Sequence, residues 1–194
     1  MFNTIFTRKI GTPGTGVGID GKNIKLVVGL GNPGEKYKNT YHNAGAIFVD
    51  HLLESMNASA AERTAWKNAK SFMYAKTTSV VLAKPTVYMN DSGRSIRELL
   101  RYFGIGPEEM LIAHDDSDLE LGSYKISYGR GSAGHNGIES IMKTLKSSEF
   151  SRLRLGTRNR TGKAGDFVLE NIKSEELASL MNLFDEIETA NFKG

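Results

Sequence analysis

The segment LVVGLGNPGEKYKNTYHNAG, residues 26–45, decides the fold. It is an apolar run that ends in glycines and is followed by a polar loop. A short apolar run bounded by turn residues is typical of a buried strand. We therefore expect a strand over residues 24–30 with a polar loop at its carboxyl end. An apolar pattern with helical spacing begins only near His42, which predicts a helix over residues 42–55.

Beyond this segment, apolar patterns with strand and helix spacing alternate along the chain. The expected strands are residues 72–77, 79–83, 110–114, 124–128 and 150–156, and the expected helices are residues 91–103, 136–146 and 174–190. The first two of these strands form a hairpin, and Asp91 or Ser92 caps the helix that stops at Gly104. This order predicts an α/β domain whose mixed or largely parallel sheet is flanked by helices on both faces. In such sheets, ligands bind beyond the carboxyl ends of the strands.

Composition sets limits on the class of protein. A chain of 194 residues with 39% hydrophobic and 24% charged side chains suits one globular domain. Its apolar runs are much shorter than the roughly 20 residues that a membrane-spanning helix needs. The absence of cysteine excludes disulfides, cysteine-ligated zinc and thiol nucleophiles, and it permits a reducing compartment.

Residues 1–23 differ from the rest of the chain. Their GTPGTGVGIDG stretch is rich in glycine and threonine and has no strand or helix period. Serine and arginine are scarce for a transit peptide. We interpret this segment as a flexible extension, either a linker, a tag or a native tail, and expect the catalytic domain at residues 24–194.

The formal net charge of +3 is small, but the positive charge is unevenly distributed. The segment 151–165 has no acidic residue and carries five basic ones: Arg152, Arg154, Arg158, Arg160 and Lys163. Such a stretch can neutralise several phosphates. An ordinary solvated face is an equally good interpretation of the charge pattern alone.

Four loops gather polar groups just after expected strands or just before expected helices. They are GLGNPGEKYKNTYHNAG at 29–45, KPTVYMNDSG at 84–93, HDDSDL at 114–119 and GRGSAGHNG at 129–137. They supply His42, Asp115, His135, Asn32, Asn43, Asn90 and Asn136. A carboxylate on one imidazole nitrogen fixes the tautomer, so that the other nitrogen can take a proton from water. The sequence pattern also allows a histidine that only makes local hydrogen bonds, which is our interpretation of His51 and His114.

Three other kinds of chemistry do not fit the residue types. Gly29, Gly31 and Gly34 match G-x-G-x-x-G, but no helix begins inside the glycines and no acid ends a second strand about 20 residues on. Ser132 lacks the first glycine of G-x-S-x-G, because Arg130 stands there. The acids that follow the strand at 110–114 fit neither H-E-x-x-H nor a calcium loop. We therefore expect neither a bound nucleotide nor a metal ion.

The chain resembles the bacterial-type peptidyl-tRNA hydrolase family. The resemblance is carried by LVVGLGNPGEKYKNTYHNAG, KPTVYMNDSG, HDDSDLELG, GSAGHNG, FSRLRLG and GDFVL, in family order and spacing, over about residues 25–188. It implies a single α/β domain with a twisted mixed sheet, acting as a monomer in the cytoplasm without metal or cofactor. The implied reaction is hydrolysis of the ester bond between a peptide and its tRNA.

The resemblance also implies roles for individual residues. The family's catalytic histidine corresponds to His42 and its partner aspartate to Asp115. For Asn136 we expect a role in water positioning or oxyanion binding, and for Asn32 and Asn90 contacts with the tRNA 3′ end and the peptide backbone. The full predicted set for substrate binding is Asn32, Tyr37, Met89, Asn90 and Asn136. The predicted phosphate contacts are Lys125, Arg130, Lys143 and Arg154.

The chain departs from the family at two places that concern the RNA. Ser127 stands where a second lysine is common, and the chain stops at Gly194, where relatives continue with more helix. The first departure leaves the strength of the tRNA contact open, and the second indicates either looser substrate binding or a truncated chain. An alternative is an RNA-binding relative without catalysis, like the splicing factors of plant chloroplasts, which a large exposed apolar patch would favour.

Overall fold

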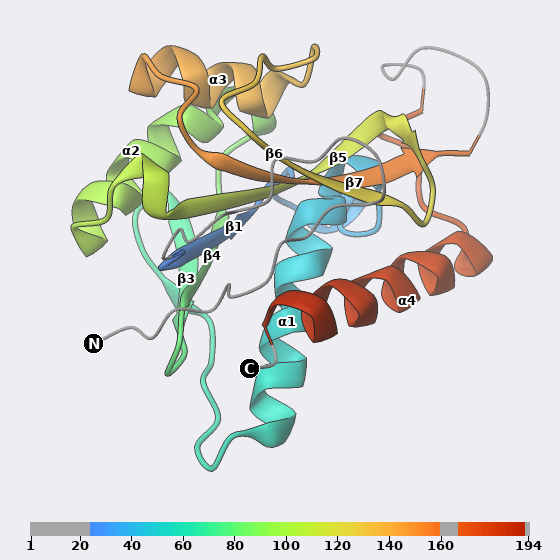
Figure 1. Cartoon of the computed structure of the whole chain (residues 1–194), viewed down its shortest axis with the longest axis horizontal. Helices are drawn as coiled ribbons and strands as arrows, with labels where there is room; N and C mark the ends of the chain where they lie inside the picture. The colour runs from blue at the N-terminus through green and yellow to red at the C-terminus, as the bar shows by residue number, and fades with distance from the viewer. Residues whose placement is uncertain (1–23, 160–166, 193–194) are drawn as a thin grey trace.

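A computed structural model describes residues 24–159 and 167–192, and in this part of the chain a single sheet lies between two layers of helices (Figure 1). Four parallel strands form the middle of the sheet. They are β1 (Leu26–Gly29), β4 (Val81–Pro85), β5 (Met110–Glu120) and β7 (Ser151–Arg158). The expectations for residues 1–23, Arg160 and Lys163 lie outside the described residues.

Antiparallel strands complete both edges of the sheet. They are β2 (Lys67–Asn68) and β3 (Phe72–Lys76) beside β4, and β6 (Tyr124–Tyr128) beside β7. The strand order is β2-β3-β4-β1-β5-β7-β6. The expectation of a mixed, mostly parallel sheet in a single α/β domain is confirmed, and the hairpin of β3 with β4 is present.

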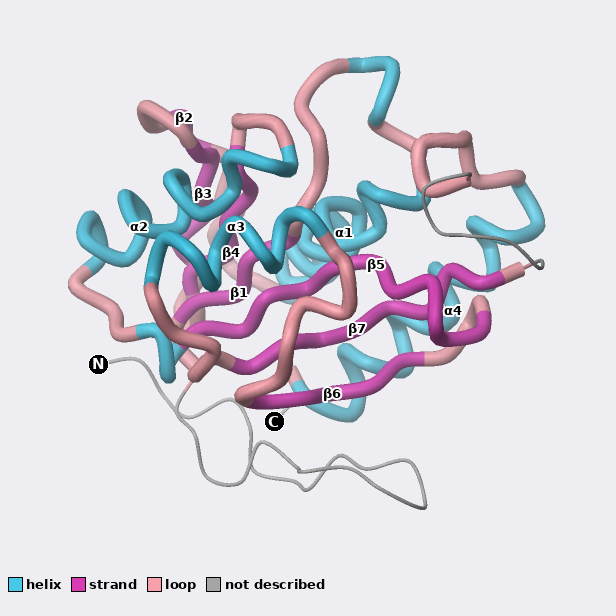
Figure 2. Tube along the Cα trace, turned by 90° about the horizontal axis from the view of Figure 1, so that it is seen from above, coloured by secondary structure: helices cyan, strands magenta, loops and turns pink. Residues whose placement is uncertain are grey.

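The two faces of the sheet are covered by different helices (Figures 1 and 2). Helices α1 (Ala44–Ser59) and α4 (Ser174–Asn191) cover one face, and α2 (Ser92–Phe103) and α3 (Asn136–Leu145) cover the other. Strand β1 shows why both layers form. Its side chains alternate, so Val27 packs in the α1 and α4 core while Leu26 and Val28 pack in the α2 and α3 core.

Several element boundaries differ from the expected ones. Strand β5 continues to Glu120 because its polar residues still pair with β7, with an irregularity between Asp116 and Glu120. The helix expected from His42 begins at Ala44, because Tyr41–Asn43 form a 3-10 turn. Strand β2 was not expected, because its two residues are exposed and carry no apolar pattern.

The start of α2 corrects the predicted cap. Asp91 is the N-cap residue by position, but its side chain makes no capping hydrogen bond; the chain enters α2 through a 3-10 turn at Met89–Asp91. The predicted end is correct. Gly104 adopts the left-handed conformation, with φ 63°, and its N–H donates to the carbonyl of Leu100.

Two glycines allow α1 to begin directly against the sheet. A Cβ atom on Gly45 would lie 2.2 Å from the backbone oxygen of Ala113 on β5, and one on Gly29 would lie 2.1 Å from the backbone oxygen of Gly45. Only residues without a side chain permit such an approach. The turn that carries His42 is therefore held beside the end of the buried part of β5.

Two findings concern the outer surface. None of the helices in the described ranges combines the length and apolar character that crossing a bilayer requires. Large hydrophobic side chains are exposed at Tyr88, Tyr102 and Leu169 in the described chain, and they come from three different segments.

Candidate active site

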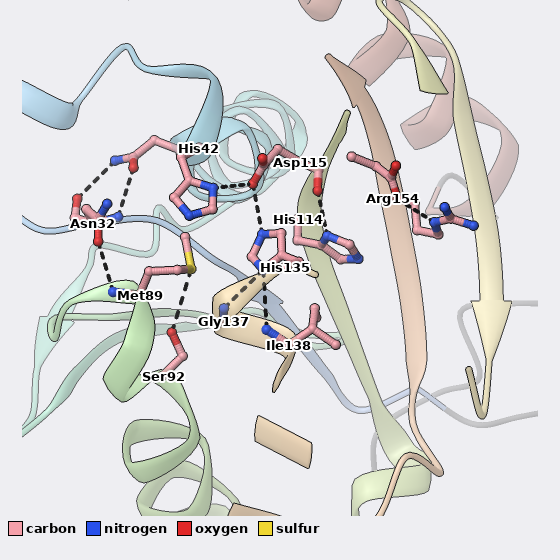
Figure 3. Close-up of polar contacts among 12 residues, drawn as sticks. Asn32, His42, Met89, Ser92, His114, Asp115, His135, Gly137, Ile138 and Arg154 are labelled. Carbon is pink, nitrogen blue, oxygen red and sulfur yellow. Dashed lines mark hydrogen bonds and ion pairs between the residues drawn. The ribbon is translucent and has the colours of Figure 1, made fainter. Parts of the chain in front are cut away.

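His42 and Asp115, which the sequence analysis paired, are in direct contact (Figure 3). His42 lies in the 3-10 turn before α1, where its backbone N–H donates to the carbonyl of Val168. Its Nδ1 is 2.8 Å from Oδ1 of Asp115, and both side chains are buried. Because an ionised carboxylate only accepts hydrogen bonds, Nδ1 carries the proton. The Nε2 atom of His42 then has the free lone pair that a general base needs.

His135 approaches the same carboxylate from the loop before α3. Its Nε2 is 2.9 Å from Oδ1 of Asp115, and its Nδ1 accepts the backbone N–H groups of Gly137 and Ile138 at 3.1 and 3.3 Å. Because Nδ1 is the acceptor, the proton of the neutral ring sits on Nε2 and is donated to Asp115. His135 therefore caps α3 and supports the carboxylate with one ring, a role that sequence reasoning did not assign.

Burial and hydrogen bonds oppose each other in the electrostatics of this pair. Burial alone would raise the pKa of Asp115, but the charge and hydrogen-bond effects of His135 and His42 outweigh it and hold that pKa well below its ordinary value. Burial would likewise lower the pKa of His42, but the hydrogen bond and charge of Asp115 outweigh it and raise that pKa above 6.5. Asp115 is thus a carboxylate at neutral pH and favours the imidazolium of His42.

The other two histidines lie outside this pair. His114 is buried beneath His135, with ring centroids 4.7 Å apart, and its Nδ1 donates to the backbone oxygen of Asp115. Burial, followed by the charge of His135, lowers its pKa well below 6.5, so it packs as a neutral ring. His51 faces α4, with its Nε2 3.1 Å from a carboxylate oxygen of Asp185.

The loop after β1 is held in shape by two asparagines. The backbone N–H of Asn32 donates to Oδ1 of Asn43, and Nδ2 of Asn43 donates back to the carbonyl of Asn32. The Oδ1 atom of Asn32 accepts the backbone N–H of Met89, which is buried. With its oxygen committed, Asn32 has its NH₂ group available to donate to a ligand. Asn43 is a positioning residue that the predicted site set omitted.

A cleft of about 230 Å³ opens over the histidine pair. Its lining includes His42, Asp115, His135, Asn136 and Val168, so the three predicted catalytic residues share one cavity. Asn136 is the exposed first residue of α3. It also borders a second groove, whose lining includes Asn90 and Lys143.

The remaining predicted substrate contacts lie near Met89 rather than in the cleft itself. The half-buried ring of Tyr37 meets the exposed Tyr88 edge to face, with centroids 6.3 Å apart. Asn90 is exposed and lines the groove between α2 and α3 together with Asn136. Of the predicted substrate residues, only Asn136 lines the cleft itself, and Asn90 and Asn32 border neighbouring cavities.

A basic pocket of about 340 Å³ lies on the β6 and β7 side of the cleft. We call it the basic pocket, and its charged lining residues are Lys125, Arg130, Arg152 and Arg154. Three of the four predicted phosphate contacts therefore come together. Lys143 does not join them, because it lies on α3 and pairs with Glu139 at 2.7 Å.

Arg152 is a member of this pocket that the predicted set left out. It lies opposite Ser127 across β6 and β7, two residues along the strand from the pair of Lys125 with Arg154. Its guanidinium donates to the carbonyl of Gly131, in the loop that leads to His135. The i, i+2 spacing of the two arginines in FSRLRLG, which places them on one face of a strand, is a signal that could have found it.

The group of one carboxylate and two imidazoles also has the composition of a metal site. His42, Asp115 and His135 offer ligand atoms within 4.8 Å of one another. The two imidazole nitrogens that face the carboxylate carry protons, however, and a metal ligand must be deprotonated. A metal ion here would have to replace both hydrogen bonds to Asp115, so the arrangement suits proton transfer better.

Comparisons with known proteins identify the family of the chain. The model of the peptidyl-tRNA hydrolase family matches residues 26–191. Peptidyl-tRNA hydrolases of Nitrosomonas europaea and Geobacter metallireducens are each 40% identical to the chain, over 84% of this chain and 84% of theirs. The crystal structure of peptidyl-tRNA hydrolase from Acinetobacter baumannii superimposes with a TM-score of 0.77 at 33% identity, covering 87% of this chain and 86% of that one.

Proposed function

This chain belongs to the peptidyl-tRNA hydrolase family, and we propose that it hydrolyses the ester bond of peptidyl-tRNA with His42 as the general base. The observation that carries the proposal is the contact between Nδ1 of His42 and Oδ1 of Asp115 at the floor of a cleft lined by Asn136. This contact supports the proposal because it leaves Nε2 of His42 on the side of the ring away from the carboxylate. There Nε2 can accept a proton from water.

The first step is attack of water on the ester carbonyl. Nε2 of His42 takes the proton from the water molecule, and Asp115 stabilises the imidazolium that forms. A positioned general base typically contributes ~10²–10⁴-fold to the rate. The raised pKa of His42 suits the return step, in which the imidazolium gives its proton to the departing 3′ oxygen of the tRNA.

Attack places negative charge on the carbonyl oxygen, and a donor must meet that charge. Asn136 borders the cleft from the first turn of α3, where its side-chain amide can donate to this oxygen or hold the attacking water. One such donor is typically worth ~2.7–4 kcal/mol. The N-terminus of α3, where Asn136 lies, also favours negative charge nearby.

Binding divides between the peptide and the RNA. Asn32 and Asn90, together with Tyr37 and Met89, hold the peptide backbone and the 3′ end around the ester. The basic pocket holds phosphates, which suits an enzyme that must accept every tRNA and so cannot depend on base readout. Lys143 is a further, separate phosphate contact. We propose action as a monomer in the cytoplasm, without cofactor or metal in the chemical step.

The test is release of peptide from an N-acetylated dipeptidyl-tRNA by the purified protein and by His42→Ala. We expect the variant to lose ~10²–10⁴-fold in kcat, because it lacks the base, while its tRNA affinity is nearly unchanged. His51→Ala is the matched control, since His51 faces α4 and not the cleft. Circular dichroism checks that both variants are folded.

Two outcomes would refute the proposal. If the wild-type protein binds tRNA but releases no peptide, the chain is a binding protein with an unused site. If His42→Ala keeps the wild-type rate, His42 is not the base.

A chelator added to the wild-type assay should leave hydrolysis intact, provided that a monovalent salt keeps the tRNA folded.

A further inference from the structure

Asp115 lies between two very different surfaces. It is on β5, which has β1 and β4 on one side and β7 and β6 on the other. The basic pocket lies on the β7 side, and a pocket of about 400 Å³ lies on the β1 side. Figure 3 shows the same arrangement, with Arg154 on one side of the pair of His42 and Asp115 and Asn32 on the other. We call this second cavity the Asn32 pocket; its lining includes Asn32, Pro33, Ala46, Ile47, Met73 and Pro85.

The charged groups around the Asn32 pocket neutralise one another. Nζ of Lys84 lies 2.6 and 2.8 Å from the two carboxylate oxygens of Asp50 and 4.4 Å from the ring centroid of Trp66. At the rim, Lys38 is 3.7 Å from a carboxylate oxygen of Glu35. The two lysines of this lining are matched by two acids, whereas the lining of the basic pocket has four basic residues and no acid, and of these only Arg154 is paired in the described part of the chain, with Asp116. The Asn32 pocket therefore does not favour a phosphate as the basic pocket does.

The direction of the substrate follows from this difference in charge. An ester carbonyl at His42 has the tRNA on one side and the peptide on the other, so the two must leave the cleft in different directions. The basic pocket accounts for the RNA. The peptide then leaves past Asn32, whose NH₂ group can donate to a peptide carbonyl, and reaches the apolar walls formed by Ile47 and Met73.

We propose that the Asn32 pocket binds the side chain of the penultimate residue of the substrate peptide and prefers a large uncharged one. This inference rests on the proposed function. Burying a leucine-sized side chain gains about 1.5–3 kcal/mol, which corresponds to roughly 10–100-fold. A charged side chain gains less, because it would lose water beside cations and acids that are already paired.

The experiment compares N-acetylated dipeptidyl-tRNAs that share the tRNA and the esterified residue and differ in the penultimate one, which is Leu, Gly, Asp or Lys. For the wild type we expect kcat/KM to be roughly tenfold or more higher for Leu than for Gly, with Asp and Lys no better than Gly. Thr86→Trp, at the exposed rim of the pocket, should shrink the ratio of Leu to Gly by filling the cavity.

Thr78→Trp is the matched control. Thr78 is also an exposed threonine, but it lies in the turn before β4, at the opposite end of that strand from Thr86, and borders a different cavity. It should keep the wild-type ratio. Equal kcat/KM for the Leu and Gly substrates in the wild type would overturn the inference without the need for any variant. Loss of hydrolysis for every substrate would instead refute the proposed function, so the two failures are distinguishable.

Discussion

The two flanks of the cleft use polar residues in opposite ways. On the β1 side, Asn32 and Asn43 are tied to the backbone by hydrogen bonds, and Lys84 is neutralised by Asp50. On the β7 side, Arg152 lies opposite Ser127 and Arg154 lies opposite Lys125. Of the two arginines only Arg154 has an acid, Asp116, bonded to its side chain in the described contacts.

The difference teaches how one cleft can serve two polymers. Cations without an acidic partner attract a phosphate backbone over several ångströms, and this attraction weakens as the salt concentration rises. Oriented amides and paired charges instead offer local hydrogen bonds and a fitting surface, without a long-range electrostatic attraction. In the proposed reaction the chemical step takes place between the flanks, beside Asp115, whose pKa is strongly lowered. Changes at the centre should therefore lower kcat, and changes on either flank should act mainly on binding.

After removal of His42 itself, Asp115→Asn should have the largest effect on the rate. The amide cannot compensate an imidazolium, and it can also hold His42 in the wrong tautomer, so kcat should fall by roughly 10–100-fold or more. Gel-shift affinity for tRNA should be unchanged, because the RNA flank is intact. A large loss of tRNA affinity in Asp115→Asn, together with a normal kcat, would contradict the assignment of catalysis to the centre and of binding to the flanks.

His135→Asn should have the next largest effect, because it separates the two roles of that ring. Asparagine is a good N-cap, so α3 should stay capped, but its side chain is too short to reach the carboxylate as Nε2 of His135 does at 2.9 Å. We expect kcat to fall by roughly tenfold, with KM and the melting temperature almost unchanged. His135→Ala should lose about 1 kcal/mol of stability in addition. An unchanged kcat in His135→Asn would show that Asp115 needs only His42.

Arg154→Ala should have the smallest effect on rate and should act on the RNA flank alone. Its tRNA affinity should weaken several-fold, and the slope of log affinity against log salt should flatten by about one unit, because one phosphate contact is lost. Arg101→Ala, on the exposed face of α2, is the matched control and should keep the wild-type slope. A wild-type slope in Arg154→Ala would remove Arg154 from the RNA surface.

Much of the fold could be predicted from the sequence, because most of its strands and helices have a clear apolar period. β1, β6 and α3 are found close to their expected bounds. The missed parts have no such period: β2 is two exposed residues, and the outer half of β5 is polar and is held by pairing with β7. Long-range pairing of this kind leaves no local signal.

The site could be predicted only in part, for a related reason. Sequence motifs name His42, Asp115 and Asn136, but the contact of His135 with Asp115 joins a loop residue to the middle of β5, and no local pattern signals it. The same holds for Arg152, whose hydrogen bond to Gly131 ties β7 to the loop before α3. Lys143 is the opposite case. It was predicted to contact phosphate together with the other basic residues, but it lies on α3 beside Glu139, outside the basic pocket.

The central claim is that His42, raised in pKa by Asp115, is the base. Its most direct test is the pH dependence of kcat/KM for one peptidyl-tRNA in the wild type and in Asp115→Asn. A base must be deprotonated, so the wild-type rate should rise with pH through a midpoint above 6.5 and then level off. In the variant the support of the carboxylate is gone and burial remains, so the midpoint should move below 6.5. A midpoint that stays in place, or a rate that does not depend on pH, would contradict the claim.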